Sequence, residues 1–311
     1  MEVLLLFPGQ GSQKPGMAKD LAEAYPAARD VWTRVDDALG TTLSTVAFDG
    51  PADALTLTHN AQPALLAHGA AVWAIVRDRI APRVRAAAGH SLGEFSAFHA
   101  VGALPLEDAV RLVRRRGELM HEAGTTRPGA MAAILGVLER PIEQICAEAG
   151  AAGVVVPANY NAPEQVVVSG EIAGVDRAMA LAKSAGAKRA VRLNVSGAFH
   201  SPLMASALPG LALALAGAHW ADPSYPVYSN VTGERVAGAA LARELLGRQL
   251  VSPVRWVTLI QAMAADHPGA LFVEMGPGNV LTGLLKRLAP QHRAVPCGTA
   301  SEVESLLQLA S

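Results

Sequence analysis

The sequence predicts an α/β fold in which a parallel sheet is covered by helices and a smaller α+β unit is inserted into the larger body. Two observations favour it. Short runs of β-forming residues alternate with longer helical stretches, which is typical of parallel sheets. The pattern becomes richer in strands near Thr125 and returns to α/β alternation after Ser196.

The first part of the chain contains two predicted strands. Val3–Phe7 and residues 84–88 are apolar runs of the length expected for buried strands. Amphipathic periodicity predicts a helix over residues 63–80, and two further helices are predicted over 93–101 and 105–122. Strands separated by helices in this way pair in parallel.

The middle of the chain has the order β-α-β-β-α-β over about 65 residues, which is the ferredoxin-like order. The predicted elements are Ala130–Leu135, 141–149, 154–159, Gln165–Gly170, 172–185 and 190–193. We therefore expect a ferredoxin-like subdomain over residues 127–195, inserted into a larger catalytic domain made of residues 1–126 and 196–311.

After Ser196 the sequence predicts helices over 202–216 and Ala239–Gln249 and a late strand within 270–278. The apolar run LPGLALALAGAHW, residues 208–220, is too short for a bilayer, which needs about 20 residues, and is expected to form a core helix.

Composition excludes several classes of partner. Of 311 residues 51% are hydrophobic, and the formal net charge of −1 gives no electrostatic footprint for nucleic acid or an anionic membrane. The two cysteines, Cys146 and Cys297, lie far apart and outside any CxxC or Cys/His ligand spacing, so neither a disulfide framework nor a zinc site is indicated. The chemistry considered below needs no metal or redox cofactor. The N-terminal apolar run has no basic leader and is broken by Pro8 and Gly9, so a cytoplasmic location is expected.

The segment GHSLG, Gly89 to Gly93, has the G-x-S-x-G spacing between a predicted strand and a predicted helix. The glycines allow a sharp turn that exposes the hydroxyl of Ser91, which predicts a nucleophile for acyl chemistry. This spacing alone does not decide whether the acyl group passes to water or to another acceptor.

A serine nucleophile needs a base, and the sequence offers nine histidines. His200 is the candidate, because NVSGAFHSPLM places it at the junction between the two units, just before Pro202. A loop histidine without a catalytic role is the competing interpretation. No carboxylate between Ser91 and His200 has an evident orienting position, although a backbone carbonyl is able to fix the imidazole tautomer.

Two further features point to acyl binding. FPGQGSQ follows the first strand, so the backbone N–H groups of Gln10 and Leu92 form a candidate oxyanion hole, with a simple tight turn as an equal alternative. Arg116, on the predicted helix after the elbow, is able to grip a carboxylate with two hydrogen bonds if it faces the cleft. A salt-bridged helix arginine is otherwise the favoured interpretation.

The chain resembles the malonyl-CoA:acyl carrier protein transacylase family along essentially its whole length. The similarity is carried by eight motifs in family order: FPGQGSQ, GHSLGE, RRRGELM, ANYNAPEQVVVSG, SGAFHSPLM, SNVTGE, RQLVSPVRW and EMGPGNVLTGL. It implies an α/β-hydrolase-like large domain with an inserted ferredoxin-like subdomain. It also implies a ping-pong transfer through a malonyl-serine intermediate, with malonyl-CoA and an acyl carrier protein as partners.

The resemblance assigns roles to single positions. It implies Ser91 as nucleophile, His200 as general base, and the backbone carbonyl of Gln249 as the group that orients the histidine. Arg116 corresponds to the arginine that pairs with the malonyl carboxylate, and the amides of Gln10 and Leu92 to the oxyanion hole. Asn159 and Asn161 correspond to polar positions beside the cleft.

The resemblance also bears on selectivity and pathway. Phe199 in GAFHS and Leu92 in GHSLG are similar to malonyl-selective members, because an aromatic ring leaves little room for a 2-methyl branch. SGAFHSPLM is closer to acyltransferases of polyketide synthases, so fatty-acid and polyketide synthesis both stay open. Since carrier proteins are acidic, four basic residues of the small subdomain are candidate contacts: Lys183, Lys188, Arg189 and Arg192.

Two other functions are consistent with the elbow motif. One is an acyl-thioester hydrolase or editing enzyme on the same fold, which would release the acyl group to water. The other is a docking module with a relic site, which would form no acyl-enzyme. The combination of Ser91, His200, Arg116 and Gln249 favours the transferase.

Overall fold

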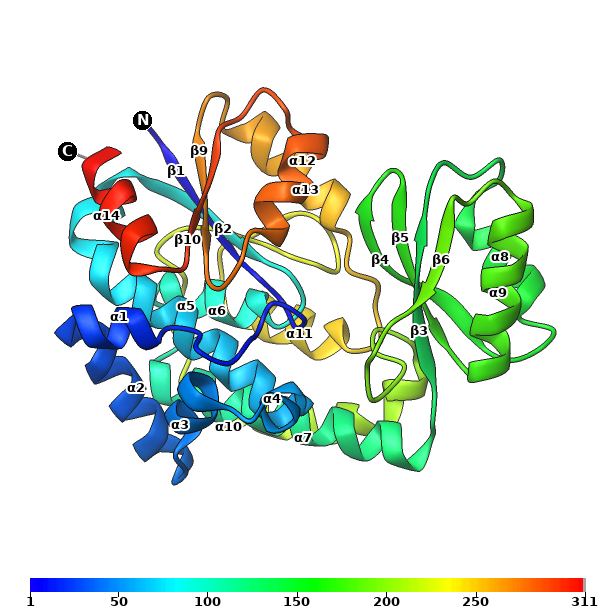
Figure 1. Ribbon diagram of the computed structural model, residues 1–311, viewed down its shortest axis with the longest axis horizontal. Helices are drawn as coiled ribbons and strands as arrows, with labels where there is room; N and C mark the ends of the chain where they lie inside the picture. Colours follow the sequence, from blue (N-terminus) through cyan, green and yellow to red (C-terminus); the bar gives the residue numbers. More distant parts are fainter. Residues whose placement is uncertain (310–311) are drawn as a thin grey trace.

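The computed structural model describes residues 1–309, and its larger sheet has six strands (Figure 1). They are β1 (Val3–Phe7), β2 (Val84–Gly89), β7 (Val227–Tyr228), β8 (Arg235–Val236), β9 (Leu271–Met275) and β10 (Ala294–Cys297). Their order is β10-β9-β1-β2-β7-β8, and every neighbouring pair is parallel except β7 and β8. β1 therefore lies at the centre of a mainly parallel sheet.

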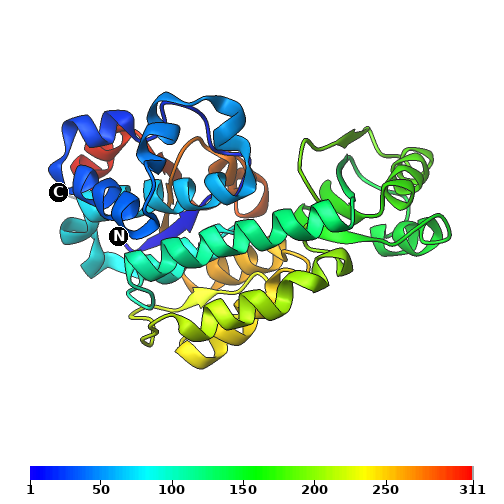
Figure 2. The ribbon, with the colours of Figure 1, turned by 90° about the horizontal axis from the view of Figure 1, so that it is seen from below.

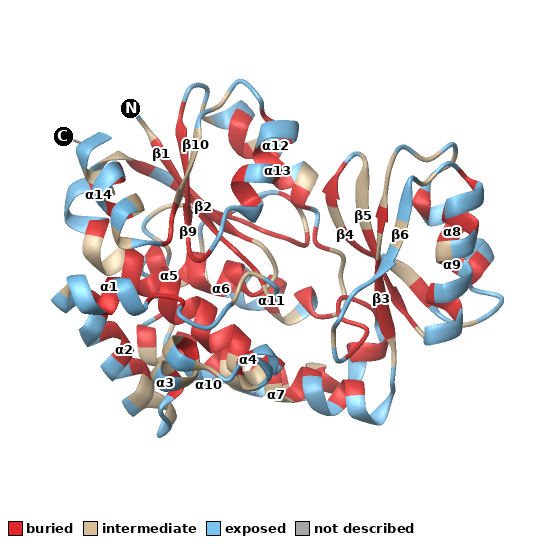
Figure 3. Cartoon of the chain, viewed as in Figure 1, coloured by how far each residue is buried: buried red, intermediate tan, exposed pale blue. Residues whose placement is uncertain are grey.

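Both faces of this sheet are buried, which explains why β1 is a continuous apolar run (Figure 3). Leu5 and Phe7 belong to the core cluster that includes the helix α5 (Thr58–Ile80), whereas Leu4 and Leu6 pack in a second cluster with α12 (Trp256–Asp266). Successive side chains of a strand point to opposite faces, so one five-residue strand contributes to two cores.

The remaining helices of the larger body surround this sheet or lie beside it. They are α1 (Lys19–Ala24), α2 (Pro26–Leu39), α3 (Leu43–Asp49), α4 (Ala52–Thr56), α6 (Gly93–Ala100), α7 (Leu106–Thr126), α10 (Leu208–Gly217), α11 (Ala239–Gln249), α13 (Val280–Leu288) and α14 (Ala300–Leu309). Two short 3-10 segments, η1 (Ala81–Arg83) and η2 (Pro202–Ala207), precede β2 and α10. No helix among residues 1–309 combines the length and the apolar character needed to cross a membrane.

The smaller sheet is antiparallel and has the order β4-β5-β3-β6. Its strands are β3 (Ala130–Leu135), β4 (Val155–Ala162), β5 (Gln165–Gly170) and β6 (Arg189–Arg192), and its helices are α8 (Ile142–Ala149) and α9 (Ile172–Ser184). The two helices pack on one face of the sheet around a separate core. Chain order and strand order are those of a ferredoxin-like unit, so the predicted fold class is confirmed.

A single helix, α7, leads from the larger body to the smaller sheet (Figure 2). Its buried residues recur at helical spacing and include Leu112, Arg116 and Met120. The chain returns from β6 through residues 193–201, so α7 and this return segment connect the two sheets.

Two predicted helices differ from the structure. α5 begins at Thr58, because the N–H groups of Asn60 and Ala61 already bond to the carbonyl of Leu57, and Pro63 lies inside the helix. The run 208–220, expected to form a core helix, is helical over Leu208–Gly217, and only one face of this helix is in the core: Leu211 and Leu215 are buried, whereas Leu213 is 76% exposed. Alternating leucine and alanine gave the segment a high hydropathy without giving it two buried faces.

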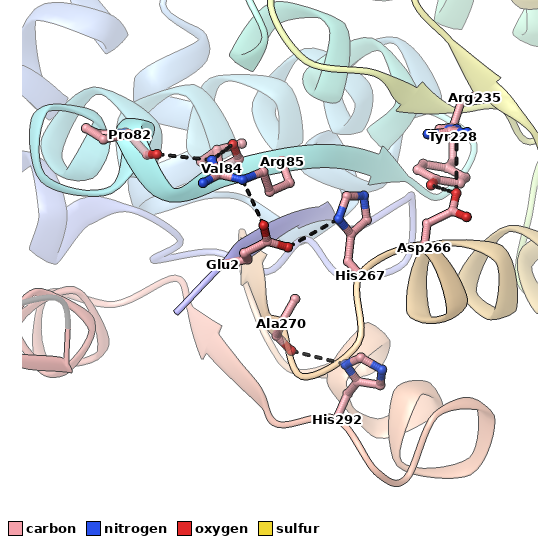
Figure 4. Close-up of polar contacts among 10 residues, drawn as sticks. All are labelled: Glu2, Pro82, Val84, Arg85, Tyr228, Arg235, Asp266, His267, Ala270 and His292. Carbon is pink, nitrogen blue, oxygen red and sulfur yellow. Dashed lines mark hydrogen bonds and ion pairs between the residues drawn. The ribbon is translucent and has the colours of Figure 1, made fainter.

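Polar contacts hold the edge of the larger sheet where β1, β2 and β9 begin (Figure 4). The carboxylate of Glu2 accepts hydrogen bonds from Arg85 Nε at 3.0 Å and from His267 Nδ1 at 3.4 Å. Further along β2 in the same view, beside the end of β7, the Tyr228 hydroxyl donates to Asp266. The opposite edge, where the parallel strands end, is the one that binds ligands in folds of this type.

Candidate active site

Ser91 occupies a sharp turn between β2 and α6 at the carboxyl edge of the larger sheet. Its φ of 51° is left-handed, which is uncommon for a residue with a side chain. A Cβ on Gly89 would lie 1.9 Å from the backbone of Gly93, and a Cβ on Gly93 would lie 2.1 Å from the Phe7 carbonyl oxygen. Both glycines are therefore required for strand and helix to approach closely enough to present Ser91.

A buried asparagine fastens this turn. Asn230 Oδ1 accepts a hydrogen bond from the Ser91 N–H at 2.7 Å, and Asn230 Nδ2 donates to the Gly89 carbonyl at 2.7 Å. The Asn230 side chain is fully buried, so these bonds have no competition from water. One side-chain amide thus satisfies two backbone groups of the turn, the Gly89 carbonyl and the Ser91 N–H.

His200 lies beside Ser91, with Nε2 at 2.8 Å from Ser91 Oγ. Its Nδ1 is 3.0 Å from the carbonyl oxygen of Gln249 and 3.1 Å from that of Ser252. Because carbonyls only accept, Nδ1 carries the proton and Nε2 presents its lone pair to the serine. Burial, and then the charge of Arg116, lower the pKa of His200 to about 3, so the imidazole is neutral.

Arg116 is 1% exposed and reaches the nucleophile from α7. Its Nη2 donates to Ser91 Oγ at 3.1 Å and to Gln249 Oε1 at 2.9 Å, and its Nη1 donates to Gln62 Oε1 at 2.8 Å. Burial lowers the pKa of Arg116 to about 10, which leaves the guanidinium charged at neutral pH. No carboxylate forms an ion pair with it among residues 1–309, so its charge is directed at the cleft.

Two backbone amides near Ser91 have no acceptor of their own among residues 1–309. Gln10 and Leu92 both line the cleft, one after β1 and the other directly after the nucleophile. Within the described chain neither N–H donates to another residue. A pair of unused amides beside a nucleophile is the arrangement that stabilises a tetrahedral oxyanion.

The cleft around these groups has a volume of about 210 Å³. Phe199 and Met120 contribute to its apolar wall, while Asn159 and Asn161 contribute polar groups from β4. Asn161 Oδ1 is 2.8 Å from His90 Nε2, so His90 bonds a side chain rather than the backbone. Within residues 1–309 no three His, Cys, Asp or Glu side chains are grouped to hold a metal ion.

The structure brings together the site residues that the sequence singled out: Ser91, His200, Gln249, Gln10, Leu92, Arg116, Phe199, Asn159 and Asn161. Four functional residues were missed, namely Gln62, Glu94, Asn230 and Ser252. A signal existed for all four. Gln62 interrupts an apolar helix, while Glu94, Asn230 and Ser252 lie in the motifs GHSLGE, SNVTGE and RQLVSPVRW.

A left-handed serine at a strand-to-helix turn, with a neutral histidine and unused backbone amides, defines a serine-nucleophile enzyme of the α/β class. The model of the acyl transferase domain family matches residues 4–305. The chain is 43% identical to the malonyl CoA-acyl carrier protein transacylase of Bacillus subtilis, over 99% of this chain and 96% of the relative. With the enzyme of the same name from Escherichia coli K12 it shares 41% identity, over 98% of each chain.

Solved structures agree with these relatives. The acyl-carrier-protein S-malonyltransferase of Bartonella henselae superposes with a TM-score of 0.94 at 41% identity, covering 100% of this chain and 99% of that one. A malonyl-transacylase in complex with its type II PKS acyl-carrier protein gives 0.94 at 38% identity, covering 99% and 100%. This chain belongs to the malonyl-CoA:acyl carrier protein transacylase family.

Proposed function

We propose that this protein transfers a malonyl group from malonyl-CoA to the phosphopantetheine thiol of an acyl carrier protein, in fatty-acid or polyketide synthesis. One observation carries the proposal: the charged, buried Arg116 touches the same Ser91 oxygen that bonds to His200. A nucleophile with a cation beside it suits an acyl group that ends in a carboxylate.

The first half-reaction acylates Ser91. His200 Nε2 takes the hydroxyl proton as Ser91 Oγ attacks the thioester carbonyl, and the Gln10 and Leu92 amides hold the negative oxygen. The tetrahedral intermediate collapses, the carbon–sulfur bond breaks, and His200 returns the proton to the CoA thiolate. The products are malonyl-Ser91 and free CoA.

The second half-reaction reverses these steps with another thiol. His200 takes the proton of the carrier's phosphopantetheine thiol, whose sulfur attacks the ester carbonyl of malonyl-Ser91. The same amides stabilise the oxyanion, the serine oxygen leaves and recovers its proton, and the malonyl group departs on the carrier. The Gln249 and Ser252 carbonyls stabilise the transient imidazolium in both halves.

Two proposals about organisation accompany this mechanism. We place the subdomain boundaries at residues 126/127 and 195/196, where α7 has ended and where the chain returns to the cleft. We also propose that the carrier docks beside β6, because Lys183, Lys188, Arg189 and Arg192 are exposed there and Leu193 and Asn194 line the cleft.

The test is mass spectrometry of the protein after mixing with malonyl-CoA, followed by addition of a holo acyl carrier protein. The wild type should gain a malonyl adduct on Ser91 and lose it to the carrier, and Ser91→Ala should gain none. Arg116→Ala should lose malonyl labelling far more than acetyl labelling. An adduct on Ser91→Ala, or equal losses for the two substrates, would contradict the assigned roles.

The same experiment separates transfer from hydrolysis. A thioester hydrolase would lose the adduct to water at a rate that does not depend on the carrier. Transfer is favoured because the relatives named above are transacylases.

A further inference from the structure

We propose that Glu94 is a positioning residue, which acts through the Gln249 side chain to hold Arg116 in place for the acyl carboxylate. The inference rests on the proposed function, because it concerns how the carboxylate-binding arginine is aligned. A chain of hydrogen bonds carries it: Glu94 to Gln249, Gln249 to Arg116, and Arg116 to Ser91.

Glu94 is a buried carboxylate in the first turn of α6, three residues after the nucleophile, with 1% of its surface exposed. Its Oε2 accepts a hydrogen bond from Gln249 Nε2 at 2.6 Å and a longer one from the Asn230 N–H at 3.4 Å. A buried carboxylate with no Lys or Arg in direct contact is costly, so its position calls for an explanation.

The amide nitrogen and the amide oxygen of the Gln249 side chain bond to partners of opposite charge. Nε2 donates to the Glu94 carboxylate and to the Ser91 carbonyl, and this leaves Oε1 to accept from Arg116. Arg116 only donates and Glu94 only accepts when ionised, so the amide has one possible orientation. The short bond to the charged acceptor is the strongest of the three and fixes the amide plane.

The amide also keeps two opposite charges apart. A direct ion pair between Glu94 and Arg116 would occupy the guanidinium with a resident carboxylate. With Gln249 between them, Glu94 still opposes the loss of charge on Arg116, but the guanidinium face toward Ser91 stays open. When an acyl group with a carboxylate enters the cleft, Arg116 can therefore form an ion pair with it without first giving up a bond to Glu94.

The protonation of Glu94 gives the inference a pH signature. Burial raises the pKa of Glu94 to about 7, and hydrogen bonds from Gln249 and Asn230 partly oppose this. Arg116, on α7, is the charged group that acts on it. Gln249 on α11 contributes an uncharged amide, and the neutral His200 is reached only through the Gln249 backbone. Below pH 7 the protonated carboxyl loses its charge-assisted bond.

The experiment compares the initial rates of Ser91 acylation by malonyl-CoA and by acetyl-CoA in the wild type, Glu94→Gln, Gln249→Leu and the double variant. Gln249→Leu removes the amide but keeps the backbone carbonyl that His200 uses. We expect Glu94→Gln to lower the malonyl-to-acetyl rate ratio about tenfold, and the double variant to fall no further than Gln249→Leu. The wild-type ratio should drop as pH falls below 7, whereas the Glu94→Gln ratio should not change with pH.

Glu274→Gln is the matched control, because Glu274 is equally buried but caps α13 through the Leu281 and Thr282 N–H groups. It should change thermal stability without changing the rate ratio. An unchanged ratio in folded Glu94→Gln, or a ratio that rises because Arg116 loses a neighbouring negative charge, would overturn the inference. A wild type that takes no malonyl adduct would instead overturn the proposed function.

Discussion

The chemistry at Ser91 depends on a histidine whose environment suppresses its charged form. His200 is buried, its Nδ1 is committed to two carbonyls, and Arg116 lies on the other side of the same serine oxygen. A neighbouring cation would be unfavourable for a histidine that had to stay protonated. Here it is favourable, because it lowers the pKa of His200 and keeps the imidazole free to accept the serine proton.

Acylation of Ser91 by an acyl group without a carboxylate should therefore be insensitive to mild acid. With acetyl-CoA, which makes no use of the carboxylate site, we expect the rate constant for acyl-enzyme formation to be flat from about pH 8 to about pH 5. An unperturbed histidine, with a pKa near 6.5, would lose about tenfold by pH 5.5. Rapid-quench mass spectrometry across this range measures it, and a midpoint near 6.5 would contradict the assignment.

We propose that Phe199 controls selectivity on steric grounds. Its ring is buried and lines the cleft together with His200, so it occupies space that a 2-methyl branch would need. Phe199→Ser should raise kcat/KM for methylmalonyl-CoA relative to malonyl-CoA by about 10- to 200-fold.

Competition between the two CoA esters measures this ratio. Since emptying a buried Phe site costs about 3–5 kcal/mol, the assay belongs at a temperature where the variant is folded. An unchanged ratio in the folded variant would refute the steric argument.

At the scale of elements, the nucleophile turn is held by parts of the chain that are distant in sequence. The left-handed backbone of Ser91 has its N–H satisfied by Asn230, which follows β7, while β1 leaves space only for a glycine at position 93. Strain at such a turn persists only when surrounding contacts over-determine it. Asn230 is one of those contacts.

Replacing Asn230 by Ala should loosen the turn. The Ser91 N–H and the Gly89 carbonyl would both lose their partner in a buried site, and each unsatisfied group costs about 1–3 kcal/mol. We expect a lower free energy of unfolding in denaturant titration and slower malonylation of Ser91. Wild-type labelling rates in the folded fraction would show that the turn does not need this asparagine.

The elements that the sequence predicted well are those with a strong local pattern. Val3–Phe7, Ala130–Leu135, Gln165–Gly170 and Ala239–Gln249 have the predicted bounds. Strands of two residues, such as β7, have too few side chains to show a period, and α1, α3 and α4 are too short for one.

The same holds for the candidate site, where the residues that were predicted belong to local motifs. Motif residues such as Ser91 and His200 could be placed from the sequence, whereas Gln62 reaches the site only through tertiary packing, for which local sequence gives no spacing. Ser252 lies in a quoted motif but contributes its backbone carbonyl, which side-chain chemistry does not reveal.

For the whole molecule, four exposed basic residues lie on β6 and in the segment before it, and the chain runs from β6 into Leu193 and Asn194, which line the cleft. Electrostatic attraction between exposed charges acts mainly on encounter and weakens with salt. It should affect the step that involves the acidic carrier and leave the reaction with malonyl-CoA unchanged.

Lys188→Glu with Arg189→Glu should raise the KM for the acyl carrier protein, and the increase should shrink at high salt. The rate of Ser91 malonylation from malonyl-CoA should stay at the wild-type value. The matched control reverses Arg79 and Arg293, which are exposed and precede β2 and β10 at the other edge of the sheet. Equal effects of the two double variants would show that net charge, not this surface, is responsible.

The anchoring of Arg116 has a final consequence for acyl length. Its guanidinium is tied to Gln62 and Gln249 and lies over the Phe95 ring, with its carbon 5.5 Å from the ring centroid, so it has no room to withdraw from Ser91. The two ends of a bound diacid are thus held at a fixed separation. Succinyl-CoA, with one more methylene than malonyl-CoA, should acylate Ser91 at least about tenfold more slowly, because its carboxylate and carbonyl cannot both reach their partners. Labelling with the two CoA esters tests this. Equal rates would mean that the cleft adjusts to the longer diacid and that the position of Arg116 does not limit acyl length.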